Sequence, residues 1–220
     1  MKKAILYGAN GLVGSNILQE LLRSSDYDEI IAVVRTKLLI KHHKLKVLVG
    51  DFESFVDLVG DIKVDEVYIA LGTTRKKTPD DATYYQIDHD YPVLAAKIAK
   101  ENGASSVFFV SSIGANAESS FFYPKTKGQT EEAIILQDFE HTHIFRPSTI
   151  LGNRIENRPA DKIFGRIWAF ISPVLTGKLT KYRAIPAKQI AIAMINAARN
   201  PAGKMKIYYW REMKQLLTDK

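Results

Sequence analysis

Residues 2–14 read KKAILYGANGLVG, and the fold of the chain can be worked out from this stretch. The apolar residues 4–7 predict a buried parallel strand, and the amphipathic run at 11–23 predicts a helix directly after it. Between them, Gly8 allows a sharp turn, Gly11 allows close approach of a pyrophosphate, and Gly14 allows the helix to lie close to the strand. The spacing is GxxGxxG rather than GxGxxG. The strand-turn-helix context favours a phosphate-binding turn over an ordinary glycine-rich turn.

The composition is that of one globular domain. The 220 residues are 46% hydrophobic and 25% charged, which is sufficient for a sizeable core. No signal peptide and no membrane-spanning apolar run is visible, and the chain has no cysteine. We therefore expect a cytoplasmic protein without stable membrane insertion or thiolate metal sites. The net charge of +7 favours an anionic ligand, whereas scattered basic residues without a recognisable motif argue against nucleic acid.

The rest of the chain alternates apolar strands with helices. Because continuous apolar strands separated by helices form a parallel sheet covered on both faces, the pattern predicts an α/β fold with a doubly wound parallel sheet. We treat 1–220 as a single domain and expect 152–220 to form a small helical cap on the substrate side. The predicted strands are 29–34, 45–49, 66–71, 106–110, 143–145 and 206–210, and the predicted helices are 81–102 (kinked or restarted at Pro92), 123–137, 163–171 and 189–198.

The end of the second strand carries a basic residue where an acidic residue normally binds the ribose hydroxyls of NAD. Arg35 occupies this position, and an arginine suits the 2′-phosphate of NADP. The basic residues at 41–44 add positive charge nearby, and we interpret them as a solvated loop. Asp51 and Phe52, after the third strand, are expected to flank the adenine.

A second constellation follows the fifth strand. Ser111 and Ser112 stand at its end, and Tyr123-x-x-x-Lys127 begins the next helix, where positions four apart share a face. A neighbouring lysine favours the phenolate, so Tyr123 is a candidate proton donor or acceptor at a carbonyl or alcohol. Pro124 is welcome at a helix start, which predicts Tyr123 at the N-cap or in the first turn.

These motifs together resemble the atypical short-chain dehydrogenases/reductases, and in particular the Tat-interactive-protein-like NADPH-binding oxidoreductases, which have a Rossmann core. The resemblance covers nearly the whole chain. The segments that carry it are GANGLVG, LGTTR at 71–75, IDHDYP at 87–92, SSIGANAESSFFYPKTKGQTEE at 111–132 and FRPSTILGNRIENRP at 145–159.

The resemblance implies a role for each matching residue. Tyr123 would be the proton donor, Lys127 its partner and holder of the nicotinamide ribose, and Ser112 (or Ser111) the third catalytic member. The family often has two arginines after the second strand, whereas this chain has Arg35-Thr36, so NADP(H) is preferred and NAD(H) stays the alternative. The implied cofactor-binding set is Gly8, Asn10, Gly11, Leu12, Val13, Gly14, Arg35, Thr36, Ala70, Leu71, Gly72, Thr73, Tyr123, Lys127, Pro147, Ser148 and Arg154.

Three functions are compatible with this pattern. The first is an NADPH-dependent oxidoreductase that transfers hydride to or from a small carbonyl or alcohol substrate. The second is a non-catalytic NADPH-binding regulator with a protein partner, and the third is a nucleotide-sugar epimerase. His141 and His143 share a strand face but lack a third ligand, so we expect no metal site. The sequence leaves the substrate and the oligomeric state, a homo-oligomer included, open.

Overall fold

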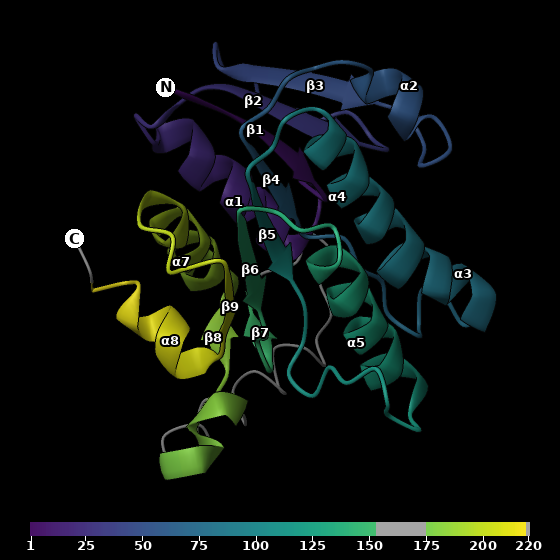
Figure 1. The fold of residues 1–220 in the computed structure, drawn as a ribbon, viewed down its shortest axis with the longest axis vertical. Coiled ribbons are helices and arrows are strands. Elements are labelled where there is room, and N and C mark those ends of the chain that lie inside the picture. The colour runs from purple at the N-terminus through teal and green to yellow at the C-terminus, as the bar shows by residue number, and fades with distance from the viewer. Residues whose placement is uncertain (153–174, 219–220) are drawn as a thin grey trace.

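A seven-stranded parallel sheet forms the centre of the protein, whose computed structural model describes residues 1–152 and 175–218 (Figure 1). The strand order is β3-β2-β1-β4-β5-β6-β9, so the strands before and after β4 are added on opposite sides of β1 and the order reverses between β1 and β4. This order confirms the predicted doubly wound, Rossmann-type sheet. The strands are β1 (Lys2–Tyr7), β2 (Tyr27–Val34), β3 (Leu45–Val49), β4 (Glu66–Ile69), β5 (Ser106–Val110), β6 (His141–Phe145) and β9 (Met205–Tyr208).

Helices cover both faces of the sheet because successive strand residues point to opposite sides. In β1, Ala4 and Leu6 belong to one apolar cluster, and Ile5 and Tyr7 belong to the other. The first cluster includes α1 (Leu12–Arg23), α7 (Ala187–Arg199) and α8 (Trp210–Gln215), which lie on the left in Figure 1. The second includes α2 (Phe55–Val59), α4 (Tyr91–Glu101) and α5 (Phe122–Ile135), which lie on the right.

The helix expected at 81–102 is divided into three parts. It starts as α3 (Asp81–Tyr85), widens to a π-helical segment η1 (Gln86–Asp90), and continues as α4. Pro92 lies in the first turn of α4, where a missing N–H is tolerated, so it marks a restart as expected. The π-helical segment is the part that the sequence pattern did not predict, and it carries the buried Asp88.

The tail beyond residue 152 requires a correction within its described part, 175–218. We expected a cap on the substrate side, but β9 is the seventh strand of the sheet and α7 packs against α1, so both complete the core. Apart from α7 and α8, the described tail contains the 3-10 segment η3 (Gly177–Tyr182) and the short strand β8 (Ile185–Pro186), which pairs with β7 (Ile150–Leu151) in a separate two-stranded sheet. The helix expected at 163–171 lies outside the described residues.

Candidate functional site

The glycine turn between β1 and α1 is built as the sequence predicts. Gly8 has a φ of +91°, and a Cβ at this position would lie 2.5 Å from the Ala70 carbonyl oxygen. A Cβ on Gly14 would overlap the Gly8 carbonyl oxygen, so only glycine lets α1 approach β1 so closely. Gly11 is the N-cap of α1, whose first turn has neither a side-chain cap nor an acidic residue. Within the described ranges, the first N–H groups of α1 therefore have no side-chain cap and can receive an anion.

The segment after β2 lies next to this turn. The Asn10 side-chain amide donates a hydrogen bond to the Thr36 carbonyl oxygen at 2.8 Å, which joins the two segments. The guanidinium of the exposed Arg35 lies 5.7 Å from the centre of the Phe52 ring and has no acidic partner among the described residues. Phe52 is itself buried and stacks on Tyr91 at 3.7 Å. The Arg35 guanidinium therefore lies over the ring of the buried Phe52.

Asp51 has a local contact of its own. Its carboxylate accepts a hydrogen bond from the backbone N–H of Ser54 at 3.0 Å, immediately before α2. The hydrogen bonds with Ser54 lower the pKa of the Asp51 carboxyl below its usual value. An ionised Asp51 thus stands at the carboxyl end of β3, where the sequence placed it.

The turn after β4 lies between the glycine turn and the helical layer. The Ala70 N–H donates to the Tyr7 carbonyl oxygen at 3.0 Å, which keeps this turn beside the end of β1. The Thr73 N–H donates to an Asp88 carboxylate oxygen at 2.7 Å. Leu71 and Gly72 lie between these two anchors. The turn is thus fixed at the position where the strand order reverses, which is where doubly wound sheets bind ligands.

Lys127 is buried and paired with an acidic residue that sequence reasoning missed. Its ammonium lies 2.7 Å from the carboxylate of Asp88, and their side chains are only 5% and 1% exposed. It also lies 5.5 Å from the centre of the Phe109 ring, and a Cβ on Gly72 would be 3.7 Å from it. Lys127 therefore reaches the turn after β4. Local composition gave no signal for Asp88, because the segment at 86–90 reads QIDHD and is mostly polar.

Tyr123 lies in the first turn of α5, where the Pro124 argument placed it. Its side chain is 41% exposed, and its hydroxyl has no hydrogen-bond partner among the described residues. The ring packs edge-on against Tyr84 with 6.5 Å between centres. The backbone N–H of Asn116 donates to the Pro124 carbonyl oxygen at 3.0 Å, which fixes the start of α5. The predicted pair therefore shares one helix, with Lys127 buried and Tyr123 facing solvent.

The two serines after β5 have different surroundings. Ser111 is buried and donates a hydrogen bond to the Glu131 carboxylate, which also pairs with Arg146. The hydrogen bond with Glu131 raises the pKa of Arg146 further above its usual value. Ser112 is half-buried, and among the described residues its hydroxyl donates to the adjacent Ile113 carbonyl oxygen alone, at 3.3 Å. The Ser111 hydroxyl is thus part of an ion-pair network, whereas no hydrogen bond within the described part of the chain joins the Ser112 hydroxyl to that network.

The segment after β6 lies beside these serines. The Ile113 N–H donates to the carbonyl oxygen of the buried Pro147 at 2.9 Å, and Ser148 follows half-buried. The structure therefore gathers the candidate residues of β1, β2, β4, β5, β6 and α5 at the carboxyl edge of the sheet. Arg154, also expected at the cofactor, lies outside the described residues.

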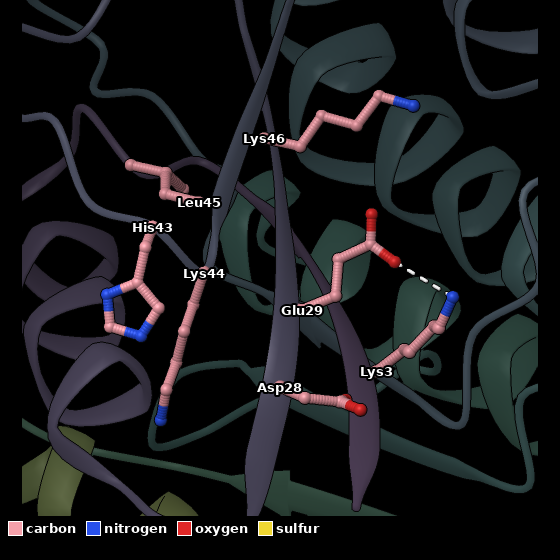
Figure 2. A pocket seen from close by; sticks show the side chains of 7 residues that line it. All are labelled: Lys3, Asp28, Glu29, His43, Lys44, Leu45 and Lys46. Atoms are coloured by element: carbon pink, nitrogen blue, oxygen red, sulfur yellow. Dashed lines mark ion pairs between the residues drawn. The ribbon is translucent and has the colours of Figure 1, made fainter.

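A separate hollow of about 360 Å³ lies at the amino ends of β1, β2 and β3 (Figure 2). Acidic and basic side chains line it together, and Lys3 and Glu29 form an ion pair of 2.9 Å across it. His43 and Lys44 line this hollow at the amino ends of the strands, where β3 begins. Arg35 lies at the carboxyl ends, so these two residues are not among its surroundings. This agrees with the interpretation of 41–44 as a surface loop, and none of the candidate site residues lines the hollow.

Comparison with known proteins defines the class to which this fold and this site belong. A family model described as NAD(P)H-binding matches residues 8–155, which span the glycine turn, Tyr123 and Lys127. The chain belongs to this NAD(P)H-binding family, within the atypical short-chain dehydrogenases/reductases. The protein fmp52, mitochondrial, of Aspergillus niger is 33% identical over 221 residues, covering 94% of both chains. The protein HTATIP2 of Rattus norvegicus is 29% identical, covering 94% of this chain and 85% of its own.

Solved structures share the fold at low sequence identity. The Bordetella bronchiseptica enzyme WbmH in complex with NAD⁺ superposes with a TM-score of 0.71 at 18% identity, covering 95% of this chain and 75% of its own. MoeE5 in complex with UDP-glucose and NAD superposes with a TM-score of 0.69 at 18% identity, covering 94% and 76%. At these identities the similarity shows the fold alone.

The comparisons also correct the expected cytoplasmic location. The fmp52 protein of Aspergillus niger is named mitochondrial, and so is the FMP52 protein of Candida albicans, which is 39% identical over 157 residues. That expectation was therefore wrong, because low cysteine content and ordinary hydropathy do not specify a compartment. Within residues 1–152 and 175–218, no helix is long and apolar enough to cross a membrane.

Proposed function

We propose that the protein is an NADPH-dependent oxidoreductase that transfers hydride between the cofactor and a small carbonyl or alcohol substrate. The observation that carries the proposal is the placement of Lys127, buried against Gly72 of the turn after β4, with the exposed Tyr123 one turn earlier in the same helix. Such a lysine would bind the nicotinamide ribose. The partly exposed phenol of Tyr123 would meet a substrate that enters from solvent.

The cofactor would lie across the carboxyl edge of the sheet, and when bound it supplies the hydride. The N-terminus of α1 would receive the pyrophosphate, because its N–H groups and helix dipole attract anions. Arg35 would bind the 2′-phosphate, since it is exposed, held over Phe52 and lacks an acidic partner among the described residues. These features favour NADP(H) over NAD(H).

Tyr123 would exchange a proton with the substrate oxygen as the carbonyl is reduced or the alcohol is oxidised. Lys127 would orient the ribose and supply positive charge near the phenol. Ser112 would hydrogen-bond the substrate oxygen, and it is preferred over Ser111 because the Ser111 hydroxyl is already bound to Glu131. Ser111 would instead fix the end of β5 relative to α5.

The test is an assay of NADPH oxidation with a panel of aldehydes and ketones, in which the loss of NADPH fluorescence measures the rate. We expect turnover of at least one carbonyl and a loss of 10²-fold or more in kcat for Tyr123→Phe, roughly the contribution of one acid-base group. NADPH binding by the variant should be retained. If Tyr123→Phe turned over at the wild-type rate, the proposed role of the phenol would be refuted. NADPH binding without turnover of any carbonyl would instead favour the regulatory alternative.

A further inference from the structure

Arg75 follows the cofactor-lining turn and lies on an aromatic cluster that includes the neighbour of Tyr123. Its guanidinium carbon is 4.4 Å from the centre of the Phe122 ring and 4.8 Å from that of Tyr84. Tyr84 in turn packs edge-on against both Phe122 and Tyr123. The Tyr84 ring therefore contacts both the guanidinium of Arg75 and the ring of Tyr123.

The hydrogen bonds of Arg75 to described residues all come from one nitrogen of its guanidinium. Its Nη1 donates to the Pro79 carbonyl oxygen at 3.3 Å and to the Asp81 carboxylate. The Nε and Nη2 groups have no partner among the described residues. These two groups form the edge that binds a carboxylate or phosphate with two parallel hydrogen bonds.

The surroundings hold this free edge in place without neutralising it fully. Contact with the Phe122 and Tyr84 rings restricts the motion of the guanidinium, which lowers the entropy cost of binding. The Asp81 side chain is 66% exposed, and such solvent-screened pairs are weak. Tyr84 is buried, and burial raises the pKa of its hydroxyl above the usual value, so it adds no negative charge.

We propose that Arg75 binds an anionic group of the substrate, a carboxylate or a phosphate, placed about one aromatic ring away from the carbon that reacts at Tyr123. The inference rests on the proposed oxidoreductase function for the position of that carbon. It makes Arg75 a specificity-determining residue and defines the substrate as an anionic carbonyl or alcohol.

The test compares probes that differ only in charge. Para-carboxybenzaldehyde, its methyl ester and para-formylphenyl phosphate are assayed as substrates with NADPH. Wild type should prefer an acidic probe over the ester by about tenfold in kcat/KM, the worth of one charge-assisted pair. Arg75→Gln should abolish that preference by raising KM for the acids alone, and Arg75→Lys should retain part of it. The more strongly preferred acid identifies the anion.

Two control variants separate binding from folding. Lys76→Gln removes the adjacent exposed cation and should leave the preference unchanged. Asp81→Asn breaks the same loop contact while keeping the guanidinium, so it should preserve or increase the preference. If wild type showed no preference, if Arg75→Gln weakened acids and ester equally, or if Asp81→Asn reproduced its effect, the proposal would be overturned.

A binding experiment keeps this inference separate from the proposed function. Para-toluate and methyl para-toluate cannot be reduced, and their binding is measured by calorimetry with and without NADPH. Preference for the toluate that disappears in Arg75→Gln supports the anion site even if no carbonyl is turned over. Equal binding of both probes by wild type contradicts it, even if the protein proves to be a reductase.

Discussion

The buried pair of Lys127 and Asp88 gives the most demanding prediction about this structure. Their charged atoms are 2.7 Å apart, and the two side chains are 5% and 1% exposed, so solvent screens neither charge. Replacing Asp88 by Asn keeps an oxygen that accepts the Thr73 N–H bond but leaves the lysine without its counter-charge. Breaking a buried pair in this way costs roughly 3–5 kcal/mol.

The magnitude can be tested with a double-mutant cycle. Asp88→Asn and Lys127→Met should each lower the free energy of unfolding by about 3 kcal/mol, a large share of the roughly 5–15 kcal/mol that stabilises a typical domain. The double variant should lose about 2 kcal/mol less unfolding free energy than the sum of the two single losses, because no charge is left unpaired. The assay is urea denaturation of the cofactor-free protein, so turnover plays no part.

An exposed pair provides the matched control. Lys97 and Glu101 lie 3.9 Å apart on α4 with side chains 65% and 63% exposed. Lys97→Met should therefore change the unfolding free energy by no more than about 0.5 kcal/mol. Additive costs in the Asp88–Lys127 cycle, or an Asp88→Asn protein as stable as wild type, would refute the account of this pair.

Two further predictions concern packing and pH. A Cβ on Gly128 would overlap the backbone of Asn116 and Ala117. Gly128→Ala should therefore lower the free energy of unfolding by about 1–3 kcal/mol, although alanine has the better helix propensity. An unchanged midpoint of urea denaturation would contradict this contact. Burial lowers the pKa of His143 to about 4 from its usual 6.5, so the unfolded chain binds a proton that the folded protein excludes. The free energy of unfolding should therefore fall by up to roughly 3 kcal/mol as the pH drops from 6.5 towards 4. His143→Phe should reduce the slope of unfolding free energy against pH, whereas His43→Gln, at an exposed histidine, should leave it unchanged. Equal slopes in wild type and His143→Phe would show that another group controls the acid limb.

The sequence was most informative where a local rule required a particular residue. The roles of Gly8 and Gly14 are predicted by their spacing between a strand and a helix, and the structure shows a positive φ at the first and backbone contact at the second. Pro124 predicted Tyr123 at the N-cap or in the first turn of a helix, and Tyr123 is the second residue of α5, which begins at Phe122. The strands of the sheet followed from apolar runs, because both faces of a parallel sheet are buried.

Other features depend on contacts between distant segments, which spacing does not reveal. The ion pair of Lys127 with Asp88 joins α5 to η1, and the choice between Ser111 and Ser112 depends on where Glu131 lies. The α2 segment Phe55–Val59 is too short to show a helical period. The strand expected at 206–210 ends at Tyr208, and Trp210 begins α8 with a capping box at Tyr209 that hydropathy did not separate from the strand.

Isothermal titration calorimetry of NADPH and NADH with wild type and Arg35→Gln tests the central claim most directly. The account predicts that wild type binds NADPH more tightly than NADH by about tenfold, and that Arg35→Gln loses this difference while still binding both nucleotides. Absence of binding heat with either nucleotide would contradict a dinucleotide site at the carboxyl edge of this sheet.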